Sequence, residues 1–162
     1  MFLHMLEIAN FFITEYEIFT FPVSLDTIDQ IIDDMNIKLI IKKNLKSTLY
    51  MDGELITGVK SRIRYREDLS HEMCHIRCHS MNKFNSNKVQ IVKNEAQAQA
   101  FAAYFLMPVF IFEQDLSDGC SDYELSENFG VCMNFIKYRK ILTESLINID
   151  YFNLNCEEDI IK

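Results

Sequence analysis

The hydrophobic pattern near the start of the chain predicts two helices. Residues 2–17 carry apolar side chains at the three- and four-residue spacing of one helix face, and the Phe21-Pro22 pair ends that pattern. Ser24 is a favourable N-cap for a second helix, which we expect to run to about Met35.

Short β-branched and alternating segments follow, and they predict a small sheet. Residues 37–42 have the composition of a strand. Residues 49–51 and 55–59 flank Asp52-Gly53, a pair that is typical of a two-residue hairpin turn. Charged and apolar residues alternate over 62–65, which predicts a half-exposed edge strand.

The pattern then returns to helical spacing. A helix that contains residues 71–79 and another over residues 94–107 are separated by a polar loop at 82–88. Helices, a small sheet and further helices in this order indicate the α+β class. We expect residues 1–148 to form one domain and residues 149–162 to form an acidic tail on its surface.

The first of these helices carries the motif H-E-x-x-H at His71, Glu72 and His75. Residues four apart on a helix differ by about 40° in direction and 6 Å in height, so both imidazoles leave one face and can bind the same metal ion. Glu72 lies beside that face, where its carboxylate can act on water without being a ligand. The motif is typical of metallopeptidases.

A catalytic zinc ion keeps three protein ligands, so a third one is needed. Glu95 is our candidate, because Ala98 and Ala102 belong to a buried stripe that places position 95 on or beside the inward face of its helix. A carboxylate there is costly unless it is paired or bound to a cation. The alternative is a first-turn glutamate that only interacts with the helix dipole.

Together the two helices resemble the active-site blocks of the ImmA/IrrE-type metallopeptidases. The segment from Ser70 to His75, followed by His79, is similar to the family's A-H-E-[LI]-[GC]-H helix. Residues 95–108 are similar to its E-x-x-A-N-x-F-A-A-x-[LF]-L-[ML]-P helix, and Arg66 and Asp68 fit the R-x-D pattern that often precedes the first block. The resemblance extends from about residue 10 to about residue 145.

The resemblance implies a zincin-like fold, metal ligands at His71, His75 and Glu95, and a catalytic base at Glu72. Zinc is the expected ion, although Mn²⁺ and Fe²⁺ suit the same set of two nitrogens and one carboxylate. Gln99 stands where the family usually has Asn, and Cys74 where Gly is usual. Neither position is a ligand in the family, so these departures concern packing rather than chemistry.

Two further residues are candidates for supporting the ligands. Asp68, one turn before His71, can orient its imidazole, but it also suits the N-cap of this helix, which we favour. His79 lies about 12 Å from His71 along the helix and cannot share an ion with both other histidines, which favours a supporting role. For an oxyanion donor, the residue types suggest Tyr65, Arg66 and Tyr104.

The five cysteines are odd in number and show no framework spacing, so we expect free thiols in a reducing compartment. Thiolate is a good zinc ligand, and Cys74 shares the histidine helix. However, Cys74 lies about 100° away from His75, and we favour a buried, small hydrophobic role for it. The other cysteines are Cys78, Cys120, Cys132 and Cys156.

Composition narrows the class of protein further. Of 162 residues, 49% are hydrophobic, which indicates a packed core, and the net charge of −8 disfavours duplex DNA as a partner of the whole domain. The N-terminal residues lack the basic region and cleavage site of a secretory signal, and no stretch has the length of a membrane span. We therefore expect a cytoplasmic protein without membrane association.

Residues 121–132, followed by a basic helix with Lys137, Arg139 and Lys140, resemble a helix-turn-helix with Gly130 in the turn. DNA binding through residues 123–140 is one interpretation. The other is a pair of packed helices that completes the core, as the family resemblance also implies. The acidic chain favours the second, and we expect no direct binding of nucleic acid.

By resemblance, the expected function is zinc-dependent cleavage of a helix-turn-helix repressor in phage, mobile-element or stress-response regulation. One alternative is a non-catalytic regulator that keeps the scaffold and binds a repressor or toxin. Another is the DNA-binding regulator described above. The presence of His71, Glu72, His75 and Glu95 together favours catalysis, because a protein that only binds gains nothing evident from all four.

Overall fold

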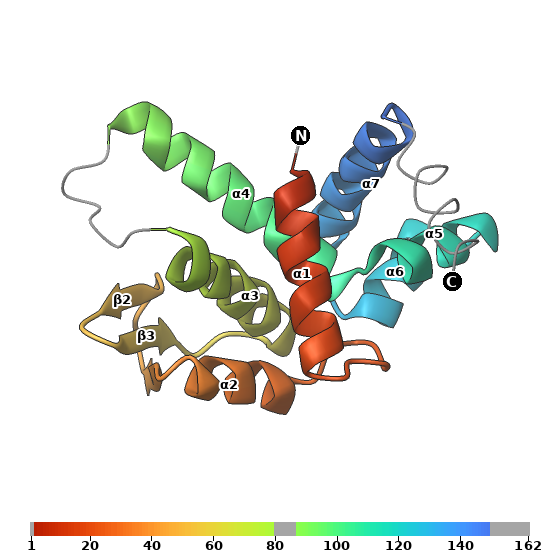
Figure 1. The fold of residues 1–162 in the computed structure, drawn as a ribbon. Helices are drawn as coiled ribbons and strands as arrows, with labels where there is room; N and C mark the ends of the chain where they lie inside the picture. Colours follow the sequence, from red (N-terminus) through yellow and green to blue (C-terminus); the bar gives the residue numbers. More distant parts are fainter. Residues whose placement is uncertain (1, 80–86, 150–162) are drawn as a thin grey trace.

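The computed structural model describes residues 2–79 and 87–149. Helices α1 (Leu3–Glu15) and α2 (Leu25–Asp34) precede a sheet, and five helices follow it in the described residues (Figure 1). The fold is mostly helical with a small sheet, which confirms the α+β class. The helices after the sheet are α3 (Arg62–Cys78), α4 (Lys88–Leu106), α5 (Val109–Ser117), α6 (Asp122–Phe129) and α7 (Met133–Ile147).

The sheet has the order β1 (Lys38–Lys42), β3 (Glu54–Gly58) and β2 (Leu49–Met51). The central strand β3 is parallel to β1 and antiparallel to β2. Asp52 and Gly53 join β2 to β3 with φ values of +50° and +79°. Positive φ at both positions is what a type I′ hairpin turn requires, so the predicted hairpin is confirmed.

The start of α2 was predicted correctly, whereas the start of α3 was not. Ser24 caps α2 as predicted, accepting a hydrogen bond of 2.9 Å from the backbone N–H of Thr27. The strand predicted at residues 62–65 is wrong, because Ser61 caps α3 and these residues form its first turn. Asp68 therefore lies inside α3, and its predicted N-cap role is also wrong.

The second half of α4 is the centre of the core. Apart from Gln99, every residue from Ala98 to Met107 is buried. The ring of Phe12 on α1 packs edge-on against Phe101 and Phe105, at centroid distances of 5.8 and 6.4 Å. Helix α4 also contacts α3 and α7, so three helices fix its position.

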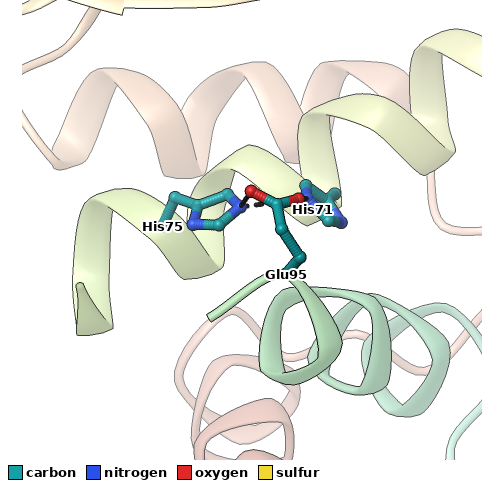
Figure 2. Close-up of side chains that lie close together, drawn as sticks. All are labelled: His71, His75 and Glu95. Atoms are coloured by element: carbon teal, nitrogen blue, oxygen red, sulfur yellow. Dashed lines mark hydrogen bonds and ion pairs between the residues drawn. The ribbon is translucent and has the colours of Figure 1, made fainter. Parts of the chain in front are cut away.

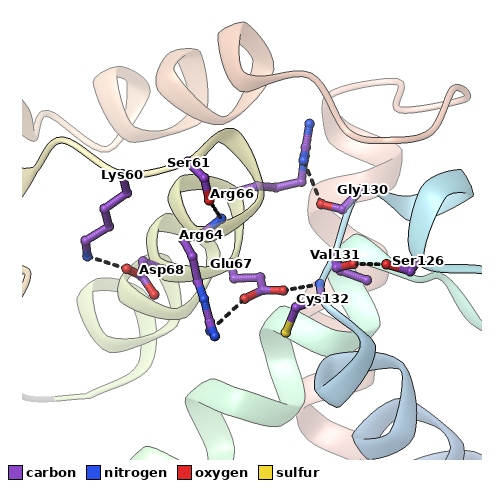
Figure 3. A network of polar contacts seen from close by, with 10 residues as sticks. All are labelled: Lys60, Ser61, Arg64, Arg66, Glu67, Asp68, Ser126, Gly130, Val131 and Cys132. Carbon is purple, nitrogen blue, oxygen red and sulfur yellow. Dashed lines mark hydrogen bonds and ion pairs between the residues drawn. The ribbon is translucent and has the colours of Figure 1, made fainter. Parts of the chain in front are cut away.

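A network of polar contacts fixes the first half of α3 (Figure 3). Arg66 is buried and donates to the carbonyl oxygens of Val23, at 2.8 Å, and Gly130, at 2.7 Å. The carboxylate of Glu67 accepts from the backbone N–H of Cys132 at 2.6 Å. The turn between α6 and α7 is thereby attached directly to the helix that carries the histidines.

The segment that resembles a helix-turn-helix is part of this core. Gly130 ends α6 in the left-handed conformation, and α7 packs against both α6 and α4. Arg139 is fully buried, Lys140 pairs with Asp122, and Lys137 is exposed. Because these three basic residues do not share one surface, the geometry favours the packed-helix interpretation.

Several sequence predictions concern residues outside the described part of the chain. Residues 150–162 of the predicted tail, including Cys156, lie outside it, as do residues 82–86 of the predicted polar loop. Cys74, Cys78, Cys120 and Cys132 are free thiols, as expected. None of the described helices combines the length and hydrophobicity that crossing a membrane requires.

The close approach at Gly130 leads to a stability prediction. A Cβ atom there would lie 2.7 Å from Nη1 of Arg66 and 2.8 Å from Cβ of Pro22, whereas one at Gly119 would meet open space. Both glycines have positive φ, so Gly119→Ala should cost about 1–2 kcal/mol of folding free energy. Gly130→Ala should cost roughly 1–3 kcal/mol more because of the clash. Chemical denaturation of both variants measures this difference, and equal losses would contradict it.

Candidate metal centre

Two helices bring three potential ligands to one point (Figure 2). His71 and His75 leave the same face of α3, with their Nε2 atoms 3.0 Å apart. A carboxylate oxygen of Glu95 on α4 lies 3.1 Å from Nε2 of His71, and its other oxygen lies 3.4 Å from Nε2 of His75. Among the described residues, these three form the group of side chains that could hold a metal ion.

The separations fit a tetrahedral ion. Ligand atoms at about 2.0–2.1 Å from a zinc ion in tetrahedral geometry are about 3.3 Å from one another. The two nitrogens are 3.0 Å apart, and they lie 3.1 and 3.4 Å from the two different oxygens of Glu95, so the separations are close to that value. Two imidazole nitrogens and one carboxylate also form a usual protein ligand set for catalytic zinc, with a fourth position open. The residues present therefore fit the metal that the motif implies.

Glu95 is held in place by its helix rather than by burial of its own side chain. Its side chain is 52% exposed, so position 95 is less enclosed than the sequence pattern predicted. Helix α4 begins at Lys88, so Glu95 is not in the first turn, and the helix-dipole alternative is wrong. The buried half of α4 begins three residues later, which fixes the backbone on which Glu95 stands.

His75 is supported from behind by His79, which ends α3. The Nδ1 atoms of the two rings are 2.9 Å apart, and Nε2 of His79 lies 3.2 Å from Oε1 of Gln97 on α4. Burial lowers the pKa of His79, and the hydrogen bond with Gln97 opposes this shift. The supporting position predicted for His79 agrees with this geometry, whereas no local pattern in the sequence pointed to Gln97.

Two hollows have His71 in their lining. One of about 250 Å³ contains Glu72 in its lining, together with Lys60, Asp68 and residues 46–48. The other, of about 300 Å³, is lined by side chains of α3, α4 and the start of α7. Asp68 lines both and forms an ion pair with Lys60. The lining residues of the second hollow are Arg64, Glu67, Asp68, His71, Gln99, Cys132, Asn134 and Phe135.

The remaining candidate residues from the sequence are engaged in packing contacts. Cys74 is buried, with its sulfur 3.7 Å from that of Met5, and a hydrogen bond with Cys78 together with burial raises the pKa of its thiol. This agrees with a packing role.

Arg66 is engaged by backbone carbonyls, Tyr65 bonds to Asp29, and the guanidinium of Arg139 covers the ring of Tyr104. These contacts favour packing over an oxyanion role for the three candidates.

Comparison with known proteins assigns the family. Residues 55–140, more than half of the chain, match the model of the M78 peptidase family, described as the IrrE N-terminal-like domain. The chain belongs to this family. The matched residues include both helices of the candidate site, and the resemblance to ImmA/IrrE-type proteins is thereby confirmed.

Two individual proteins are similar to parts of this chain. Over 55 residues, the chain is 40% identical to the phage-like element PBSX protein XkdA of Bacillus subtilis (strain 168), a match that covers 34% of this chain and 28% of that protein. A Mycobacterium tuberculosis transcriptional regulator has the same fold, with a TM-score of 0.69 at 17% identity over 84% of this chain. The chain spans only 55% of that structure, and the other match covers only 28% of the Bacillus subtilis protein, so both proteins contain parts that these matches do not cover.

If Glu95 is the third ligand, its removal should remove the metal. We expect Glu95→Gln to weaken zinc binding by more than about 100-fold, because losing even a supporting partner of a ligand costs roughly 10–100-fold. Competition with a chromophoric chelator measures the affinity. Glu144→Gln, which changes an exposed glutamate on α7, is the matched control and should bind zinc like the wild type. Unchanged affinity in Glu95→Gln would exclude this residue as a ligand.

Proposed function

We propose that this M78 family member is a zinc-dependent endopeptidase that cleaves a helix-turn-helix repressor. The observation that carries the proposal is the convergence of His71, His75 and Glu95 from two helices, with Glu72 adjoining. A zincin-like active site, as the family resemblance implies, is part of the same proposal. Zinc is the preferred ion, and Mn²⁺ and Fe²⁺ suit the same ligands.

The proposed reaction divides its tasks between the metal and one carboxylate. When bound, the ion supplies Lewis-acid chemistry that polarises the scissile carbonyl and lowers the pKa of water. Glu72 follows His71 on α3 and lines a hollow beside it, where its carboxylate can accept a proton from the attacking water. The same carboxyl group then passes this proton to the leaving amine.

The two hollows that share His71 in their lining support a polypeptide substrate. An extended chain that crosses the site would place neighbouring side chains on opposite sides of the reacting carbonyl. Asp68 and His71 line both hollows, so such a chain would pass beside His71, one of the proposed metal ligands. Neither hollow is strongly apolar in its lining residues, which suits polar as well as apolar substrate side chains.

The substrate class rests on the family and on the context of similar proteins. The Bacillus subtilis relative belongs to a phage-like element, and the structural neighbour is a transcriptional regulator. A regulatory protein of the same kind of genetic element is therefore our preferred substrate. The buried Arg139 and paired Lys140 of this chain favour a separate DNA-binding protein over direct DNA binding by residues 123–140.

Replacing Glu72 tests the reaction separately from the metal. Glu72→Gln should bind zinc normally and lose cleavage by about 10²–10⁴-fold, because general acid–base catalysis contributes factors of this size. The chain or its variant is co-expressed with the helix-turn-helix repressor encoded nearest to its gene, and repressor levels are followed by immunoblot. Loss of the repressor with the wild type, but not with Glu72→Gln, is the expected result.

Two other outcomes are informative. Equal repressor loss with both chains would refute Glu72 as the base. Stable repressor that co-purifies with both chains would replace cleavage with the alternative of a non-catalytic binding regulator. Glu144→Gln serves again as the control, because it makes the same chemical change at an exposed position on α7.

A further inference from the structure

Lys60 lines the same hollow as Glu72 and His71. It lies in the link between β3 and α3, and its side chain is only 16% exposed. Its ammonium group forms an ion pair with Asp68, which Figure 3 shows, and donates to Oγ1 of Thr48 at 3.1 Å. An ammonium group has three N–H donors. Among the residues that the structure describes, these two partners leave the third N–H available to a molecule in the hollow.

The position of this ammonium group is fixed from two sides. Thr48 directly precedes β2, and its hydroxyl oxygen lies 3.0 Å from that of Thr57, a fully buried residue of the central strand β3. Asp68 belongs to α3 and precedes His71 by about one helical turn. The ammonium group is therefore attached both to the sheet and to the helix of the histidines. A donor held in this way needs little reorganisation when charge develops beside it.

The proposed peptidase reaction develops negative charge on the substrate. As the water oxygen bonds to the scissile carbonyl carbon, one electron pair of the C=O bond moves onto the carbonyl oxygen, and Glu72 takes a proton from the water. A charged donor that meets this oxygen lowers the energy of the transition state. The donors that residue type suggested are engaged elsewhere: Tyr65 with Asp29, Arg66 with backbone carbonyls, and Tyr104 with Arg139.

The alternative for Lys60 is a structural role in its ion pair with Asp68. The side chain of Asp68 is 36% exposed, and ion pairs that are open to solvent add little to folding stability. Lys46, the other lysine in the lining, is exposed and lies in the segment before β2. Lys60 is therefore the lysine of this hollow whose ammonium group is both enclosed and held in place.

We propose that Lys60 is a further catalytic residue, which donates a hydrogen bond to the scissile carbonyl oxygen as negative charge develops on it. This role rests on the peptidase function proposed above. It gives the reaction a donor that belongs to the chain itself, in the hollow where Glu72 acts on water. Lys60 is not one of the proposed metal ligands, so zinc affinity should not depend on it.

Replacing Lys60 tests this role in the zinc-loaded chain, with the purified repressor encoded nearest to its gene as substrate. Lys60→Met should lower kcat by about 10²–10³-fold, the usual cost of removing one oxyanion donor. Because the bond is made mainly in the transition state, kcat/KM should fall by the same factor while KM stays constant. In the Glu72→Gln background, the same change should leave the affinity for the repressor unaltered.

Three further variants separate catalysis from folding. Lys60→Gln keeps a polar group beside Thr48 and Asp68 and should also lose kcat, so the test does not depend on the folding of Lys60→Met alone. Asp68→Asn breaks the same ion pair but keeps the lysine, and it should lose less kcat than Lys60→Met. Lys140→Met is the matched control, because it removes an ion pair with Asp122 whose side chains are 36% and 32% exposed, and it should keep full activity.

The outcomes separate this proposal from the proposed function. Wild-type kcat in both Lys60 variants, a rise of KM at constant kcat, or equal losses of kcat in Lys60→Met and Asp68→Asn would overturn the catalytic role of Lys60. A loss of zinc affinity in Lys60→Met would also overturn it, because the residue would then act on the metal site. A zinc-loaded wild-type chain that does not cleave the repressor would overturn the proposed function and this role with it.

Discussion

Burial of the second half of α4 is the constraint on which the remaining structure depends. Phe101 and Phe105 pack against α1, whereas Tyr104 lies against Arg139 of α7. Glu95 and Ala102 are seven residues apart and point within about 20° of each other, so the side of α4 that carries Glu95 continues into the core as a small residue. A small side chain lets α3 and α4 approach closely enough for their polar groups to meet.

The first half of α3 is held in position by two buried charged side chains, Arg66 and Glu67. Arg66 donates to backbone carbonyls from two distant parts of the chain, and Glu67 accepts from the start of α7. Such groups are costly to bury unless their hydrogen bonds are satisfied, so they favour one position of α3 over small displacements. The core therefore fixes the helix of Glu95, and the charged network fixes the helix of the histidines. The proposed site has ligands on both helices, so it depends on the packed core and on the charged network together.

The sequence predicted the features that depend on local spacing. His71 and His75 were paired by helical periodicity alone, and the Asp52-Gly53 turn and the Ser24 cap follow from residue type. The strand predicted at residues 62–65 failed because four alternating residues fit one helical turn as well as a strand. The contact between Gln97 and His79 could not be foreseen, since it depends on how α3 and α4 are aligned, and no local pattern encodes that alignment.

The segment that resembles a helix-turn-helix packs into the core and does not present a DNA-binding surface. Its turn residue Gly130 is in contact with Arg66, and its second helix contributes Asn134 and Phe135 to the hollow beside His71. A surface that binds DNA must present its basic residues together, whereas here Arg139 is enclosed by aromatic rings. What the segment presents to the proposed active site is instead one wall of a hollow. Changes at the start of α7 should therefore act on recognition of a polypeptide rather than on recognition of DNA.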